Sequence, residues 1–236
     1  MEEFNKAKNL IERYKNILVF PSPELQGDSL GSALALFYTL KKLGKNVNVK
    51  IDDVPEKFKF LTNYCQAPAG DFVISVNTEG KEISQMRYEK NGNTLKIYLA
   101  LDKGRVKNED ISFAPFPGPE LFSPQPDLLI SVGAQDLENI PQTFWGLPIL
   151  NIDNQLQNEN FGEVNLIEMT SSLAEIATNL IRLIAGDDSL DKEIATCLLT
   201  GVIWSSQNFR NPKTRPKTFE TSAFLIDKGA NHQEII

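Results

Sequence analysis

The sequence predicts an α/β protein: a parallel sheet of about five strands with helices on both faces, plus an antiparallel β-hairpin insertion. The first observation is that short apolar runs alternate with segments whose apolar residues recur at helical spacing. Such alternation is typical of parallel strands joined by right-handed crossovers. The second observation is that residues 71–101 interrupt this alternation with three strand-like segments in succession, which predicts the insertion.

The first quarter of the chain predicts two helices and two strands. Leu10, Ile11 and Tyr14 recur at helical spacing, and so do the apolar residues of the second helix. Gly44 is a typical helix stop. In chain order the predicted elements are a helix over 3–15, a strand at 17–20, a helix from about 30 to 43 and a strand at 47–51.

The middle of the chain predicts the insertion and a loop. The three strand-like segments are DFVISVN, EISQMRYE and TLKIYLAL, and Asn91-Gly92 is a hairpin-turn signal between the last two. Residues 115–126 contain five prolines, which predicts an irregular loop rather than another element.

The C-terminal half predicts two more buried strands and then helices only. DLLISV at 127–132 and LPILNID at 147–153 have the composition of buried parallel strands. Three helices follow at roughly 171–185, 189–206 and 217–228. The last residues, NHQEII, resemble the start of a further helix that is cut off, so we expect the chain to be a fragment of a longer protein.

Charge and cysteine content indicate which partners and which cellular compartment to expect. The net charge of −7 argues against an overall attraction to nucleic acid or anionic membranes, although a local basic patch can still bind phosphate. No apolar run approaches the length of a membrane span. Cys65 and Cys197 are far apart in the sequence and fit a reducing setting better than a disulfide framework. We therefore expect a cytoplasmic protein with no membrane partner.

Four segments of the chain carry a family resemblance. They are GDSLGSALAL with the following LKKLGKNV, then PDLLISVGAQDL, then NIDNQLQNENFGEVN with SSLAEI, and finally LLTGVIWSSQNFRNPKTRPKTF. In this order and spacing they resemble the DHH phosphoesterase family of RecJ-like exonucleases, oligoribonucleases and 3′-phosphoadenosine-5′-phosphate phosphatases. The resemblance covers most of the chain outside residues 55–125.

The resemblance implies the N-terminal domain of such a protein. We therefore expect residues 1–236 to form a single DHH-like α/β domain, with the β insertion at 71–101 and the proline-rich loop at 115–126. The smaller DHH-associated domain of the family would follow after a linker, and we expect it to be absent from these 236 residues.

The resemblance also implies a two-metal phosphoesterase site whose ligand positions are mostly replaced. Family members hold two manganese-type ions with histidines and aspartates. Two of the family's acidic positions survive here, at Asp28 and Asp153. The other matching positions carry neutral residues: Ser22, Gln26, Gly133, Asn154, Gln155 and Ser205.

These replacements have a direct physical consequence. Neutral amides and hydroxyls do not offset the repulsion between two divalent ions, which requires anionic ligands. The single histidine, His232, lies outside the four segments and supplies neither a ligand nor a base there. We therefore expect no cofactor. An active site of this kind would need Mn²⁺ or Mg²⁺, with Asp28 and Asp153 as its ligands.

Each candidate residue also has a structural interpretation. Asp28 begins a helix and can accept backbone N–H bonds there, and Asp153 can cap a turn at the end of a strand. Gly27 and Gly31 allow either close approach of a ligand or tight packing of a helix on a strand. The ligand-binding candidates are, in chain order, Gly27, Asp28, Ser29, Gly31, Asn154, Gln155, Arg210 and Thr214.

Further charged residues lie close to the altered segments. Glu24 and Asp136 could replace lost ligands, or they could be free surface and loop carboxylates. A basic cluster could hold phosphate groups together with Thr214, or could be a solvated loop. Its members are Arg210, Lys213, Arg215 and Lys217.

Three functions follow as hypotheses. The first is a catalytically degenerate domain, a pseudoenzyme, that binds a nucleotide, a short oligonucleotide or another phosphorylated ligand without hydrolysing it. The second is an active metal-dependent phosphoesterase with a rearranged site. The third is a structural or protein-interaction module that uses the hairpin EISQMRYEKNGNTLKIYLAL as its contact surface, and homodimerisation is one assembly left open.

Overall fold

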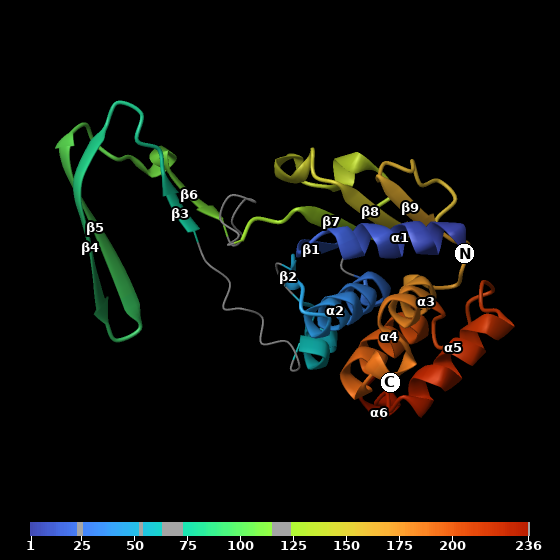
Figure 1. Ribbon diagram of the computed structural model, residues 1–236. Helices are drawn as coiled ribbons and strands as arrows, with labels where there is room; N and C mark the ends of the chain where they lie inside the picture. The colour runs from blue at the N-terminus through green and yellow to red at the C-terminus, as the bar shows by residue number, and fades with distance from the viewer. Residues whose placement is uncertain (23–25, 52–53, 63–72, 115–123, 236) are drawn as a thin grey trace. The chain divides into compact units, whose positions relative to one another are not determined.

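The computed structural model describes residues 1–22, 26–51, 54–62, 73–114 and 124–235 (Figure 1). These residues divide into two compact units, and each is described by itself. Unit 1 comprises Met1–Pro68 and Gly118–Ile236, and unit 2 comprises Ala69–Pro117. The expected organisation, a single domain without a DHH-associated domain, stays a prediction.

Unit 1 contains a five-stranded parallel sheet among the described residues, which confirms the predicted fold class. The strand order is β2-β1-β7-β8-β9, and every neighbouring pair is parallel. The strands are β1 (Asn16–Pro21), β2 (Asn46–Val49), β7 (Leu128–Val132), β8 (Ile149–Asp153) and β9 (Val164–Ile167). All residues of β7 and β8 are buried, as expected for inner strands covered on both faces.

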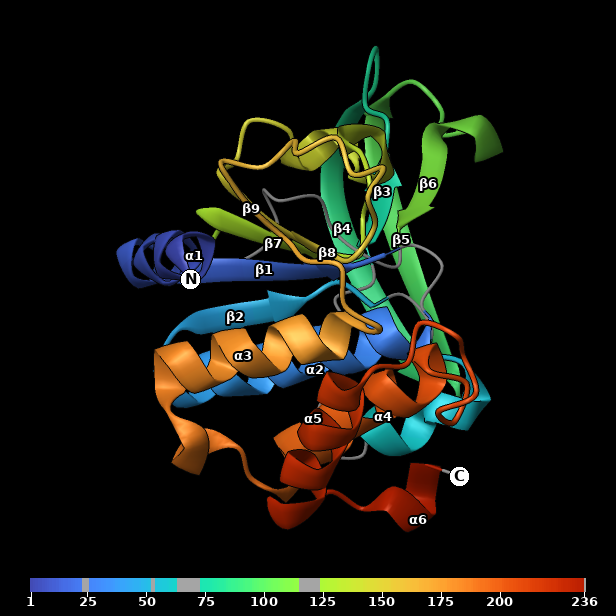
Figure 2. The ribbon, with the colours of Figure 1, turned by 90° about the vertical axis from the view of Figure 1, so that its right-hand side faces the viewer.

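The long helices bury their apolar sides in one core on a single face of the sheet. They are α1 (Glu2–Arg13), α2 (Gly27–Lys42), α3 (Leu173–Ala185), α4 (Lys192–Ser205) and α5 (Pro216–Asp227). In Figure 2, α2 and α3 run side by side along this face. The last residues form the short helix α6 (His232–Ile235).

The opposite face of the sheet carries a second, smaller core. Phe20, Leu129 and Ile149 from the strands pack there against Ile140 and Phe144. Single 3₁₀ turns, η4 (Leu137–Asn139) and η5 (Gln142–Phe144), cover this face. Among the described residues, α-helices thus cover one face of the sheet and short 3₁₀ turns cover the other.

Helix α2 is the centre of the unit, because every residue from Gly27 to Leu40 is buried. It lies against α4 at a point where both helices carry glycine. A Cβ added at Gly31 would clash with the carbonyl oxygen of Cys197, and one added at Gly201 would lie 2.8 Å from the Cβ of Ala174. Gly31 is therefore explained by close helix packing, which sets the start of α2 beside α3 and α4.

Unit 2 consists of two antiparallel strand pairs. Strand β3 (Val73–Val76) pairs with β6 (Ile111–Ala114), and β4 (Glu82–Asn91) pairs with β5 (Thr94–Lys103). The predicted hairpin is confirmed, with Asn91 opposite Thr94 and Gly92 at a φ of 58°. Most of the predicted proline-rich loop, residues 115–123, lies outside the described residues.

Two short strands of the structure were not predicted from the sequence. Strands β6 and β9 have four residues each and were not among the predicted elements. Among the described residues, no helix is long and apolar enough to cross a membrane.

Candidate functional site

A pocket of about 910 Å³ opens in unit 1 at the carboxyl ends of β1, β7 and β8. This is the edge at which open parallel sheets bind ligands. The four segments singled out in the sequence meet there, from the loop after β1, the turns after β7 and β8, and the end of α4. The pocket is lined by Ser22, Gln26, Asp28, Ser29, Gly133, Gln135, Asp153, Asn154, Gln155, Leu173, Ile203, Trp204, Ser205, Gln207, Asn208, Asn211 and Ile235.

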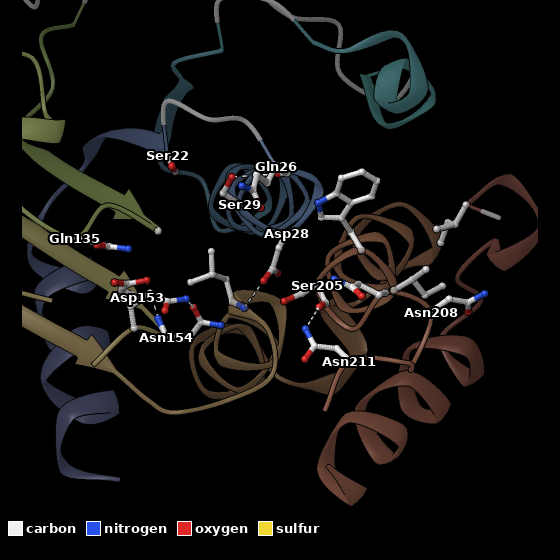
Figure 3. A pocket seen from close by; sticks show the side chains of 17 residues that line it. Ser22, Gln26, Asp28, Ser29, Gln135, Asp153, Asn154, Ser205, Asn208 and Asn211 are labelled. Atoms are coloured by element: carbon white, nitrogen blue, oxygen red, sulfur yellow. Dashed lines mark hydrogen bonds between the residues drawn. The ribbon is translucent and has the colours of Figure 1, made fainter. Parts of the chain in front are cut away.

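Asp28 lies on the helical side of the pocket and is only 7% exposed (Figure 3). Its Oδ2 accepts the backbone N–H of Leu173 at 2.8 Å, and its Oδ1 accepts that of Ala174 at 3.0 Å. Ser172 accepts the next N–H, that of Glu175, through its Oγ. Asp28 thus caps helix α3 from helix α2, because the first N–H groups of a helix have no partner within it.

Burial raises the pKa of Asp28 from 3.8 to about 7. The hydrogen bonds from the backbone N–H groups of Leu173 and Ala174 favour the charged carboxylate and act in the opposite direction, but burial outweighs them. Near neutral pH this side chain therefore carries a full negative charge only part of the time.

Asp153 lies on the strand side of the pocket, at the end of β8, and is 1% exposed. Its Oδ1 accepts the backbone N–H of Asn154 at 2.8 Å, and its Oδ2 accepts Nδ2 of Asn158 at 2.9 Å. Burial raises the pKa of this carboxyl as well, against these hydrogen bonds. Asn158 also donates to the carbonyl oxygen of Ala134 at 2.9 Å, so Asp153 anchors the turn after β8 to the loop after β7.

A third buried carboxylate, Glu175, stands behind the helical side of the pocket. It is 2% exposed and accepts hydrogen bonds from the hydroxyls of Ser171 and Thr218. Because Thr218 belongs to α5, Glu175 ties the start of α5 to the start of α3. Sequence reasoning missed this residue. Its available signal was the spacing of Ser172 and Glu175, which is that of a capping box.

The rest of the polar lining is neutral. Its side chains are amides and hydroxyls: Ser22, Gln26, Ser29, Gln135, Asn154, Gln155, Ser205, Gln207, Asn208 and Asn211. No lysine, arginine or histidine is among the described lining residues. The pocket therefore offers hydrogen bonds in number and little charge.

A left-handed turn presents two of these amides. Gln207, Asn208 and Phe209 have φ values of 50°, 56° and 64°, a conformation that L-residues adopt at a cost of about 1 kcal/mol or more each. Phe209 stacks on Phe219, with ring centroids 4.9 Å apart, and its N–H donates to Oγ of Ser206 at 3.0 Å. These contacts hold the turn against its strain.

Trp204 forms the aromatic part of the wall. Its ring meets Phe58 edge to face at 5.1 Å, and Nζ of Lys57 lies 3.7 Å from a ring centroid of Trp204. A Cβ added at Gly27 would lie 2.7 Å from Phe58 and 2.8 Å from Trp204. Gly27 thus makes room for this aromatic pair, and neither Gly27 nor Gly31 lines the pocket.

The remaining candidates lie elsewhere. Arg210 and Thr214 follow the left-handed turn but do not line the pocket, and Arg210 is exposed. Asp136 caps η4, with its Oδ1 accepting the N–H of Asn139 at 2.8 Å. Glu24 lies outside the described residues.

The donor set does not fit a pair of divalent cations. Two such ions need several anionic ligands, and the described lining supplies only Asp28 and Asp153 as carboxylates. Both oxygens of Asp28 already face the N–H groups of α3. Across the described residues, no group of three or more His, Cys, Asp or Glu side chains is placed to hold a metal ion.

Comparison with known proteins gives remote relatives. No family model matches the chain. Over 210 residues it is 24% identical to the bifunctional oligoribonuclease and PAP phosphatase NrnA of Thermus thermophilus, which covers 89% of this chain and 49% of the relative. It is 32% identical over 87 residues to an uncharacterized protein of Mycoplasma genitalium, covering 36% of this chain and 26% of that protein.

A solved structure agrees with the fold. An exopolyphosphatase-related protein from Bacteroides fragilis aligns with a TM-score of 0.68 at 17% identity, over 99% of this chain and 58% of that one. The chain thus spans about half the length of NrnA and of this structural relative. The structural likeness shows that this chain shares the α/β fold of that protein, and the sequence similarity to NrnA is remote.

Proposed function

We propose that this domain binds a phosphorylated ligand, such as a nucleotide or a short oligonucleotide, in the pocket and does not hydrolyse it. The observation that carries the proposal is the use of Asp28. Both of its carboxylate oxygens accept backbone N–H groups of α3, and apart from Asp153 the remaining polar lining consists of neutral side chains. Such a site offers many hydrogen bonds without the anionic ligands that two metal ions need.

The pocket retains features suited to an anionic ligand. The N-terminus of α2, a helix of 16 residues, lies at the pocket through Gln26, Asp28 and Ser29. Helix N-termini favour negative charge because their N–H groups and dipole point outward. The elevated pKa of Asp28 reduces the negative charge that a phosphate would meet there. The amides of Gln207 and Asn208, in the turn after α4, add further donors.

Binding can be followed through Trp204, because it lines the pocket. In a Trp145→Phe background, Trp204 is the only tryptophan, so its fluorescence reports on the site. We expect 3′-phosphoadenosine-5′-phosphate or a dinucleotide to change this fluorescence saturably without added metal. Adenosine is the unphosphorylated control. Equal binding of adenosine would show that the pocket does not recognise the phosphate groups. If neither 3′-phosphoadenosine-5′-phosphate nor the dinucleotide binds, the proposal is overturned.

Hydrolysis is tested separately, with the same ligands and with Mn²⁺ supplied. We expect calorimetric titration to show no Mn²⁺ binding of the kind a two-metal enzyme requires, and no turnover. Manganese-dependent turnover by the unaltered chain, lost on Asp153→Asn, would instead establish an active enzyme, the activity named for NrnA.

A further inference from the structure

Strands β4 and β5 form a two-stranded hairpin (Figure 1). One face of this hairpin carries exposed apolar side chains. Cross-strand neighbours on that face include Met86 with Leu99 and Tyr88 with Ile97. Met86 and Tyr88 are 70% and 76% exposed. An isolated two-stranded hairpin is marginally stable in water, and three or more strands with an apolar face are needed for independent stability. The geometry of unit 2 therefore calls for additional strands.

The two outer edges of this hairpin differ in their protection. Strand β4 carries four charged residues, and its register with β5 shifts at Ser84, which is opposite no residue of β5 in the strand pairing. Charges and irregular register are the usual means by which proteins block pairing at an edge. Strand β5 has the run Leu95–Leu101, in which Lys96 is the only charged residue. The edge of β5 is thus the open one.

We propose that β5 pairs antiparallel with β5 of a second copy of this chain, about a two-fold axis at Leu99. In this register Ile97 lies opposite Leu101 of the other copy, so apolar side chains meet apolar ones. Lys96 lies opposite Asp102 of the other copy, which gives two pairs of opposite charge. In the β4–β5 pairing no residue of β4 lies opposite Asp102, so its side chain can face a residue of the second copy. The result is a four-stranded antiparallel sheet.

The self-complementarity of β5 is the reason for a second copy rather than another partner. A two-fold interface requires each patch to match itself, and the sequence KIYLALD does so around its central leucine, Leu99. The proposal uses only unit 2 and is independent of what the pocket binds.

The oligomeric state of the full chain, measured by sedimentation equilibrium, is the first test. We expect a dimer that Asp102→Lys shifts to monomer, because it places lysine opposite Lys96. Adding Lys96→Asp and Glu89→Lys to that variant should restore the dimer, because this reverses the intermolecular pair and keeps opposite charges across the hairpin. A wild-type chain that stays monomeric at about 100 μM would overturn the proposal, because stable interfaces have dissociation constants well below that concentration. Failure of the triple variant to dimerise would overturn it as well.

Cysteine cross-linking tests the register. Leu99→Cys places two thiols on residues that face each other across the axis, about 4.5–5.5 Å apart at Cα, which suits a disulfide. Leu95→Cys is the matched control, because its two copies are displaced by about 27 Å along the strands. We expect mild oxidation to give a covalent dimer with Leu99→Cys only. Equal cross-linking of both variants, above the wild-type background, would contradict the register.

Discussion

On the helical side of the pocket, Asp28 gives both carboxylate oxygens to the N-terminus of α3, whereas on the strand side Asp153 binds its own turn through Asn154 and Asn158. The first arrangement joins helices whose contact residues are about 145 positions apart in the chain. The second is local. Asp28 and Asp153 match two different acidic positions of the resemblance and stabilise contacts of different range. The comparison therefore predicts different costs in unfolding free energy for losing them.

The largest expected effect is on the pH dependence of stability. Burial raises the folded-state pKa of Asp28 from 3.8 to about 7, so the folded chain holds this proton more tightly than the unfolded chain. Its contribution is fully present below pH 4 and is lost as the pH rises through 7. A shift of about three units corresponds to a loss on the order of 4 kcal/mol.

This contribution is isolated by comparison with Asp28→Asn, which does not titrate. Urea denaturation of both proteins from pH 4 to pH 8 should show the wild-type chain losing free energy of unfolding relative to the variant as the pH rises. If the free energies of unfolding of the two proteins change in parallel with pH, the pKa of Asp28 is the same in the folded and unfolded chains. Burial would then not raise the pKa of this carboxyl.

Removing the Asp28 carboxylate altogether should have the next largest effect. Asp28→Ala leaves the N–H groups of Leu173 and Ala174 buried without an acceptor, at a cost of about 2–4 kcal/mol of unfolding free energy. Asp28→Asn keeps one acceptor oxygen and should lose less. Chemical denaturation at a fixed pH measures the free energy of unfolding of both variants. An Asp28→Ala variant as stable as the wild type would show that the Asp28 cap does not stabilise α3.

On the strand side, Asn158→Ala should cost about 2 kcal/mol, because it leaves acceptors on Asp153 and Ala134 without a donor. The matched control is Asn160→Gly. Asn160 has a φ of 54°, which glycine adopts freely, so that variant should stay within about 0.5 kcal/mol of the wild type. Equal losses in both variants would show that the turn as a whole, rather than the Asp153 anchor, is what matters.

The smallest expected effect is a gain. Gln207→Gly relieves one of three consecutive left-handed residues and should stabilise the fold by about 1 kcal/mol. Gln207→Ala keeps the strain and should give no gain, which separates relief of the backbone from loss of the side chain. Thermal unfolding of the two variants, measured side by side, is sufficient, and a gain with alanine would place the cause in the side chain.

Periodicity predicted most of the fold, because long runs such as α2 and buried strands such as β7 impose their pattern on many residues at once. Strand β9 escaped prediction since VNLI offers only four residues and includes a polar one. Some residues that the sequence analysis singled out, such as Ser22 and Asp153, line the pocket, whereas others, such as Gly31 and Arg210, do not. The turn cap at Asp153 was one of the interpretations that the sequence offered. For Asp28 the sequence indicated only the kind of partner, because the backbone N–H groups that it accepts belong to α3, and no side-chain pattern marks that contact.

The capping of α3 by Asp28 also limits how this pocket could be engineered. Directing that carboxylate toward a bound cation would remove the acceptor from two buried N–H groups, so every ångström gained toward the ion would weaken the helix that forms the pocket wall. Reinstalling metal chemistry would therefore require a compensating cap on α3 before any new ligand. Variants that first gain a new cap on α3 and then new ligands should therefore stay folded. A library that varies only the ligand positions would instead contain mostly variants with a weakened α3.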